Sequence, residues 1–203
     1  INDVTANENG TFSFTVTSSN ATEEDITGTV NTANIAMEAV AGTDYTAISG
    51  GTFTITGNSS AKTDTVTVTV DDDNIVEDDE TFNVDLTNAR FNGMLDASRA
   101  TYTGGDAQGL GTITNNDTAV LEIDDVTELE NGTFTFTVSS SNPTDTNITG
   151  TINTANIGGQ AVAGTDYTAI SGATFTITGD SSDLIDTFAV TVANDRRVEG
   201  TET

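Results

Sequence analysis

The stretch TDTVTVTV at residues 63–70 alternates valine with threonine. Successive side chains of a β-strand point to opposite faces, so Val66, Val68 and Val70 would share one face and the threonines the other. The same period of two recurs in TFSFTVT (11–17), ITGTVNT (26–32), TFTIT (52–56), TFNVDLT (81–87), GLGTIT (109–114) and AVLEI (119–123). No segment carries the period of an amphipathic helix. The pattern predicts an all-β chain of short strands, each with one apolar face.

The chain also repeats itself at a constant offset of 122 residues. The segment AVAGTDYTAISG at 39–50 returns unchanged at 161–172. Residues 1–81 align with 123–203 without a gap, and 55 of these 81 positions are identical. We therefore predict a first repeat over residues 1–117 and a second over 118–203. The first is expected to lack the start of its first strand, and the second its last strands.

The number of strands predicts the architecture. Seven short strands in a unit of about 120 residues are typical of an antiparallel β-sandwich of immunoglobulin-like type. We predict two such sandwiches in tandem, with seven strands per complete unit. Threonine fills most outward positions, where a polar β-branched residue suits a solvated strand. A flat threonine array that binds ice or another lattice is the alternative interpretation of this pattern.

The composition restricts the partners. The chain has 32 acidic and 5 basic side chains, a formal net charge of −27. This charge argues against nucleic acid as a partner and disfavours docking on anionic lipid, because both are bound through Lys and Arg. No apolar run is long enough for a transmembrane span, so we expect no membrane insertion. Cys and His are absent, which leaves oxygen ligands, and these suit hard cations such as Ca²⁺.

The acidic residues concentrate in one loop. The strand at 63–70 runs directly into DDDNIVEDDE at 71–80, where seven of the ten side chains are carboxylates. Alternate loops of a sandwich meet at the same end, so Glu8, Asp44 and the segment NND at 115–117 could lie beside this loop. A cation would remove the repulsion among these charges. The alternative is a solvated acidic loop without a metal.

Four segments resemble the Calx-β domain family: GTDY at 42–45, GTFTITG at 51–57, DDNIVEDDETF at 72–82 and GLGTITNND at 109–117. Calx-β domains are seven-stranded sandwiches of sodium–calcium exchangers, of the integrin β4 tail and of large bacterial surface proteins. In the calcium-sensing members, Ca²⁺ ions bind the loops at one pole. The resemblance covers nearly the whole first repeat and the second up to residue 203, and it favours tandem repeats of a bacterial adhesin-type protein.

The resemblance also implies a ligand set for calcium. In the first repeat the implied ligands are Glu8, Asp44, Asp72, Asp73, the carbonyl of Ile75, Glu77, Glu80, Asn115, Asn116 and Asp117. In the second repeat Glu130, Asp166, Asp195 and Glu199 remain. We expect the second site to be weaker, because Asn194 replaces an acid and Arg196 and Arg197 bring positive charge to its loop.

We therefore expect a calcium-binding, calcium-rigidified spacer or stalk of an extracellular, secreted or cell-surface adhesin-like protein, whose partners are calcium ions and neighbouring repeats. Near-identical tandem copies suit such a role. The alternative is a module that binds a surface glycan or protein through its loops without an essential metal, since the segment at 89–108 is long. We expect no enzyme: acid abundance alone supports only a glycosidase with two carboxylates.

Overall fold

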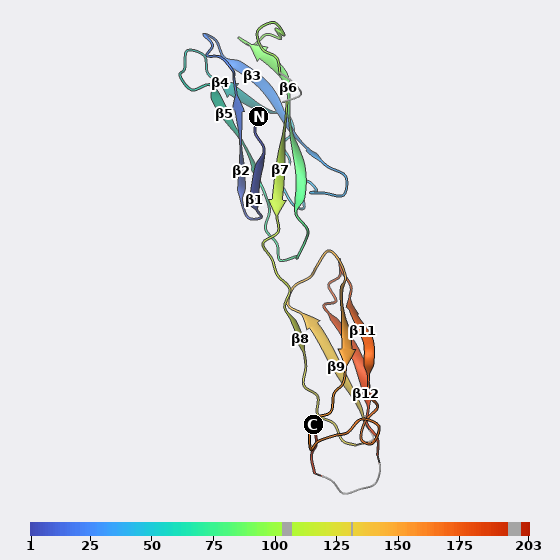
Figure 1. The fold of residues 1–203 in the computed structure, drawn as a ribbon. Coiled ribbons are helices and arrows are strands. Elements are labelled where there is room, and N and C mark those ends of the chain that lie inside the picture. Colours follow the sequence, from blue (N-terminus) through green and yellow to red (C-terminus); the bar gives the residue numbers. More distant parts are fainter. Residues whose placement is uncertain (103–106, 131, 195–199) are drawn as a thin grey trace. The chain divides into compact units, whose positions relative to one another are not determined.

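The structure is a computed structural model of the 203-residue chain, and it describes residues 1–102, 107–130, 132–194 and 200–203. The described residues form strands and no helix, as Figure 1 shows. The strands are β1 (Val4–Asn7), β2 (Thr11–Thr17), β3 (Ile26–Asn34), β4 (Gly51–Ile55), β5 (Thr63–Thr69), β6 (Glu80–Phe91), β7 (Gln108–Thr114), β8 (Leu121–Ile123), β9 (Thr133–Ser140), β10 (Ile148–Asn153), β11 (Ser171–Ile177) and β12 (Ile185–Thr191). No helix in this part of the chain is long and apolar enough to cross a membrane.

The strands form two compact units. Unit 1 comprises Ile1–Asp73 and Asp78–Asn116, and unit 2 comprises Asn74–Glu77 and Asp117–Thr203. The four residues Asn74–Glu77 of the acidic loop thus belong to unit 2, where Val76 forms a parallel bridge with Thr144. The prediction of an all-β chain of two β-sandwich units is confirmed.

Unit 1 is a sandwich of two sheets. One sheet has the strand order β1-β7-β6-β3-β4, and the other pairs β2 with β5. All of these pairs are antiparallel except β1 and β7, which run parallel from Val4 opposite Gly111 to Asn7 opposite Thr114. This parallel pair was not predicted, because alternation reveals the faces of a strand but not its direction.

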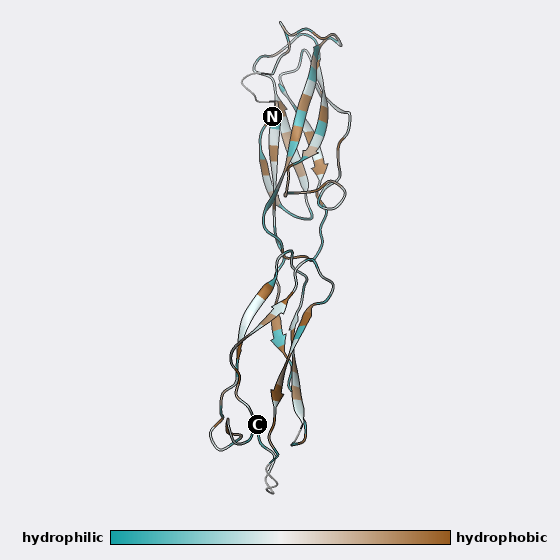
Figure 2. Ribbon diagram, turned by 90° about the vertical axis from the view of Figure 1, so that its right-hand side faces the viewer, coloured by the Kyte–Doolittle hydropathy of each residue, from teal (hydrophilic) through white to brown (hydrophobic). Residues whose placement is uncertain are grey.

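The predicted apolar faces of unit 1 meet in its core. Figure 2 shows the alternation of hydrophobic and hydrophilic residues along the strands. Phe82 of β6 lies at the centre and is fully buried. Its ring centroid lies 5.7 Å from that of Phe12, 6.1 Å from that of Phe14 and 4.4 Å from that of Tyr45. Phe82 therefore joins the face of β6 to β2 of the opposite sheet and to the GTDY turn.

Unit 2 repeats part of this arrangement. One sheet has the order β12-β9-β8, and the other pairs β10 with β11. The pairing of β9 with β12 reproduces that of β2 with β5 over seven residue pairs. Phe134 and Phe136 of β9 occupy the positions of Phe12 and Phe14, but they are only half-buried, whereas Phe12 and Phe14 are fully buried.

Candidate metal centre

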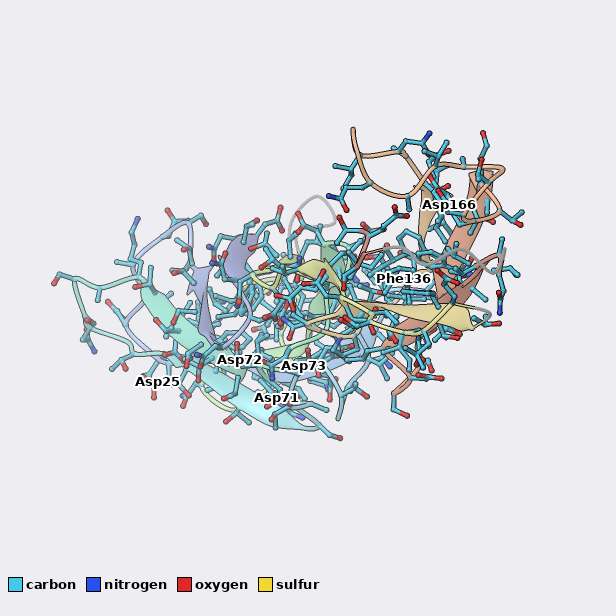
Figure 3. The ribbon with its side chains drawn as sticks, turned by 90° about the horizontal axis from the view of Figure 1, so that it is seen from below. Asp25, Asp71, Asp72, Asp73, Phe136 and Asp166 are labelled. Atoms are coloured by element: carbon cyan, nitrogen blue, oxygen red, sulfur yellow. The ribbon has the colours of Figure 1, made fainter. Side chains whose placement is uncertain are left out.

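The acidic loop begins where β5 meets two other turns. The backbone N–H of Val70 donates to the carbonyl of Gly10 at 3.0 Å, and that of Asp71 donates to the carbonyl of Asp44 at 2.9 Å. These bonds attach the end of β5 to the turn after β1 and to the GTDY turn. Asp71, Asp72 and Asp73, which Figure 3 labels, then leave the end of the strand with exposed side chains.

Three of the predicted ligands come together. Glu8, Asp73 and Asp117 each offer a carboxylate oxygen, and these oxygens all lie within 4.8 Å of one another. We call these residues the acidic triad. Glu8 is only 9% exposed, Asp73 is exposed, and the Oδ2 atom of Asp117 is buried. Burial of an ionised carboxylate oxygen is costly unless hydrogen bonds or a cation compensate for it.

The parallel pairing of β1 and β7 places two members of the triad. Both strands end at the same edge of the sheet, with Asn7 opposite Thr114. Glu8 directly follows β1, and its N–H donates to the carbonyl of Thr114 at 3.3 Å. Asp117 lies three residues after Thr114 in the sequence. Asp73 comes from the end of β5, so the triad is built from the residues that follow β1, β5 and β7.

The other predicted ligands of the first repeat lie outside this triad. Asp72 and Asn116 are exposed, and Glu80 begins β6 opposite Ile113. Ile75 and Glu77 flank Val76, whose N–H donates to the carbonyl of Pro143 at 2.9 Å, so these two residues belong to unit 2.

Asp79, which was not among the predicted ligands, connects the acidic loop to the segment after β7. Its Oδ1 atom accepts a hydrogen bond from the N–H of Asn115 at 3.2 Å. Asn115 is the residue directly after β7, so this bond ties the second half of the acidic loop to the segment that leads to Asp117. Its place in the acidic run was the only available signal, and six other acids of the run share that signal.

Comparison with known families identifies the fold. The model of the Calx-beta domain matches residues 3–108 and again residues 114–203. The chain belongs to the Calx-beta family. Calx-beta domains are typically non-catalytic binding modules. The resemblance seen in the sequence is therefore confirmed for both tandem domains.

Several solved structures are similar to this Calx-beta chain. The crystal structure of CBD12 from CALX1.2 gives a TM-score of 0.47 at 18% identity, over 97% of this chain and 74% of that one. The calcium binding domain CBD12 of CALX1.1 gives 0.47 at 19% identity, over 92% and 71%. The apo form of the Calx CBD1 domain gives 0.46 at 19% identity, over 57% and 91%. No curated protein sequence matches the chain.

In both Calx-beta domains the Asp of the GTDY motif contacts its own turn. The Oδ2 atom of Asp44 accepts a hydrogen bond from the N–H of Val40 at 2.5 Å, and that of Asp166 accepts one from Val162 at 2.7 Å. A hydrogen bond of this kind stabilises a turn locally. Asp44 was predicted as a ligand, and the structure gives it a structural contact that needs no metal.

The Tyr of the same motif anchors the turn in the core. Tyr45 is fully buried, and its hydroxyl donates to the Oδ1 atom of Asn34 at 2.6 Å. Burial raises the pKa of Tyr45, and the nearby charge of Asp44 raises it further. The hydroxyl therefore stays protonated as a hydrogen-bond donor, and the turn that carries Asp44 is held against Phe82.

We expect Asp44→Ala to lower the free energy of unfolding of unit 1 by about 1–2 kcal/mol, because the N–H of Val40 loses its charged acceptor. Asp44→Asn keeps an acceptor oxygen and should cost less than half as much. Urea unfolding of both variants, without calcium, measures these costs. Equal stability of the alanine variant and the wild type would contradict a structural role for Asp44.

In the second domain the structure describes two of the four predicted ligands. Glu130 is exposed, and Asp166 is half-buried in its turn. Asp195 and Glu199, together with Arg196 and Arg197, lie outside the described residues. The expectation of a weaker second site therefore stays a prediction.

The geometry of the acidic triad suits a hard divalent cation. Calcium binds six to eight oxygens at about 2.3–2.6 Å, so two oxygens on opposite sides of the ion are at most about 5 Å apart. The triad oxygens fall within this limit. Three carboxylates could hold such an ion, and backbone carbonyls, side-chain amides or water would supply the other ligands.

Proposed function

We propose that this Calx-beta chain binds calcium through Glu8, Asp73 and Asp117 and serves as a calcium-rigidified spacer in an extracellular, adhesin-like protein. The observation that carries the proposal is the convergence of three carboxylate oxygens within 4.8 Å. Two of the three residues are at least half-buried, so their charges are less well solvated than those of a surface loop. The strong negative charge of the chain favours a cation as the partner.

We also propose that the protein works outside the cell. Calcium modules of extracellular proteins bind with dissociation constants of roughly 10⁻⁴–10⁻³ M. A site of this affinity would be filled only where free calcium is abundant. A stalk built from repeats needs rigidity rather than a catalytic group, and two tandem domains of one family agree with such a role.

Calorimetric titration of the 203-residue chain with calcium tests the binding. We expect a dissociation constant of about 10⁻³ M or lower, and a loss of at least tenfold in affinity for Asp73→Asn. Asp73 is the best position for this test because its side chain is exposed, so the substitution should not disturb the core. Glu24→Gln, which removes an exposed acid on the 18–25 loop, is the charge-matched control and should bind as the wild type does. Identical titrations for Asp73→Asn and the wild type would refute the triad as the site.

Small-angle scattering with and without calcium tests whether the ion stiffens the connection that follows Asp117. Asp117 is followed by only three residues before β8 begins at Leu121. An ion that binds Asp117 together with Glu8 and Asp73 would fix the start of this short connection. We expect a narrower distribution of maximum dimensions in calcium than in chelator for the wild type, and no difference for Asp73→Asn. An equally broad distribution in both solutions would leave a calcium-binding chain without a stiffening role.

A further inference from the structure

A surface hollow of about 320 Å³ lies in unit 1 beside the end of β6. Its volume is at the lower end of the range for small-molecule sites in proteins. Four aliphatic side chains, one aromatic ring and three polar side chains line it: Asn88, Ala89, Leu95, Asp96, Ala97, Ala100, Thr101 and Tyr102. None of these residues belongs to the acidic triad or to the GTDY turn. The hollow is therefore a feature that calcium binding does not explain.

A strand irregularity and a glycine fix the aromatic wall of the hollow. The pairing of β3 with β6 shifts register between Thr27 and Thr29, and Thr29 lies opposite Thr87. Beside this shift, the hydroxyl of Tyr102 donates to the carbonyl of Thr87 at 3.0 Å. The hydroxyl can come this close because Gly28 has no side chain, and a Cβ atom there would lie 2.7 Å from it. The half-buried tyrosine ring is thus held in one position.

A tight turn forms another wall. The backbone N–H groups of Arg99 and Ala100 donate to the carbonyl of Asp96, at 3.0 and 2.9 Å. The Oδ1 atom of Asp96 accepts bonds from the N–H and the hydroxyl of Ser98, at 3.1 and 2.6 Å, and its Oδ2 atom pairs with Nε of Arg99 at 3.3 Å. The guanidinium of Arg99 also lies over the Phe91 ring, 5.4 Å from its centroid. A wall that is already ordered lowers the cost of binding, because little freedom remains to be lost.

The three polar side chains of the hollow keep hydrogen-bonding capacity for a ligand. The Nδ2 atom of Asn88 lies 3.4 and 3.5 Å from two threonine hydroxyls, which is the outer limit of a hydrogen bond, so the amide can turn to a better partner. A carboxylate has about four acceptor positions, and the contacts of Asp96 with Ser98 and Arg99 occupy three. The hydroxyl of Thr101 lies 3.5 Å from the carbonyl of Tyr102, an equally long contact.

This combination of groups matches a neutral sugar ring. A pyranose has a face of C–H groups, which packs on methyl groups and on an aromatic ring, and a rim of hydroxyls, which both donate and accept. A carboxylate accepts from one hydroxyl while an amide donates to its neighbour. An anion is disfavoured by Asp96 and by the net charge of −27. A metal ion is disfavoured because, among the residues that the structure describes, three acidic groups converge only in the triad.

We infer that unit 1 has a second binding site, separate from the calcium site, in which the hollow holds one ring of a neutral glycan. The ring of Tyr102 and the side chains of Ala100 and Leu95 cover the C–H face of the sugar. Asn88 and Asp96 bind its hydroxyl groups. Because the hollow is open and takes a single ring, we expect a dissociation constant of about 10⁻³ M. The inference is independent of the proposed calcium site, since the two sites share no residue.

Methyl NMR spectra of the 203-residue chain test this site. The probes are the methyl glycosides of glucose, galactose, mannose and N-acetylglucosamine, and sorbitol is the control because it has the hydroxyls but no ring face. We expect at least one glycoside to shift the methyl signals of the lining residues Ala89, Leu95, Ala97 and Ala100 in a saturable way. The signal of Ile177 in unit 2 should not move. The shifts should be the same in calcium and in chelator, so a failure of the calcium proposal would leave them unchanged.

Two variants make the outcome specific. Ala97→Phe should abolish the shifts, because Ala97 is exposed and a phenyl ring there fills the hollow without entering the core. Ala36→Phe, which adds the same ring at an exposed alanine of the 35–50 loop, is the matched control and should bind as the wild type does. Asn88→Gly should weaken binding by about fivefold, because glycine keeps the positive φ of 53° but lacks the amide.

Three results would overturn the proposal of a glycan site. The first is no shift with any of the four glycosides. The second is an equal response to sorbitol and to the glycosides, which would show a solvent effect. The third is equal binding by the wild type and by Ala97→Phe when both melt at the same temperature, which would place the sugar outside the hollow.

Discussion

Phe82→Ala is expected to lower the free energy of unfolding of unit 1 by about 3–5 kcal/mol, the typical cost of removing a fully buried phenylalanine ring. Phe82 has no exposed surface, and its ring contacts three other aromatic rings from β2 and the GTDY turn. Urea unfolding, followed by the transition of unit 1, measures the loss. The equivalent transition of unit 2 is the internal reference, because it contains none of these contacts. A loss below about 1 kcal/mol would contradict the central position of Phe82.

A double-mutant cycle with Gly111 separates packing from strand propensity. Gly111 faces Phe82 across β6 and β7, and a Cβ atom at residue 111 would lie 2.5 Å from Cζ of the Phe82 ring. Gly111→Ala alone should therefore cost about 1–3 kcal/mol through overpacking. In the Phe82→Ala background the added methyl group has room, so its cost should nearly vanish. Gly158→Ala, where a Cβ atom meets nothing within 4 Å, is the matched control. Strictly additive effects of Phe82→Ala and Gly111→Ala would show that the added methyl group does not compete with the Phe82 ring for the same space.

Calcium is expected to raise the melting temperature of unit 1 by about 10 °C or more. A ligand at 100 times its dissociation constant stabilises the folded state by about 2.7 kcal/mol if it binds only that state. For a domain of about 100 residues, each kcal/mol shifts the melting temperature by roughly 4 °C or more. Differential scanning calorimetry in calcium and in chelator measures the shift.

Asp73→Asn should lower the melting temperature in calcium but not in chelator. In calcium the variant should melt below the wild type, because one charged ligand is lost. In chelator it should melt at the same temperature as the wild type or above it, because one of three neighbouring negative charges is removed. Glu24→Gln should show the full calcium shift. A variant that melts below the wild type by the same amount in both solutions would indicate a purely structural role for Asp73.

The sequence predicted the strands of unit 1 well because period-two alternation directly reports one buried face. The segment 11–17 is β2 without any change of boundary, and 63–70 exceeds β5 by only one residue. β6 is longer than predicted and continues to Phe91, because the polar residues at its end break the alternation. The parallel pairing of β1 with β7 had no signature, since pairing partners are set by the tertiary fold.

The candidate site was predictable as a region but not as a set of atoms. The density of acids in residues 71–80 pointed to the loop that carries Asp73, and the rule that alternate loops of a sandwich meet at one end brought Glu8 and Asp117 into the candidate set. Sequence could not show that Asp73, rather than Asp72, meets them, because adjacent residues differ only in the direction of their side chains. Nor could it show that Asp44 bonds to the N–H of Val40, since a ligand and a turn-stabilising Asp have the same identity.

The most direct test is a crystal structure of the 203-residue chain grown with calcium, with the ion located by its anomalous scattering. We expect an anomalous peak with carboxylate oxygens of Glu8, Asp73 and Asp117 at about 2.3–2.6 Å from it. Crystals at millimolar calcium with no peak at these three residues, or with a peak held only by other acids of the 71–80 loop, would contradict this expectation.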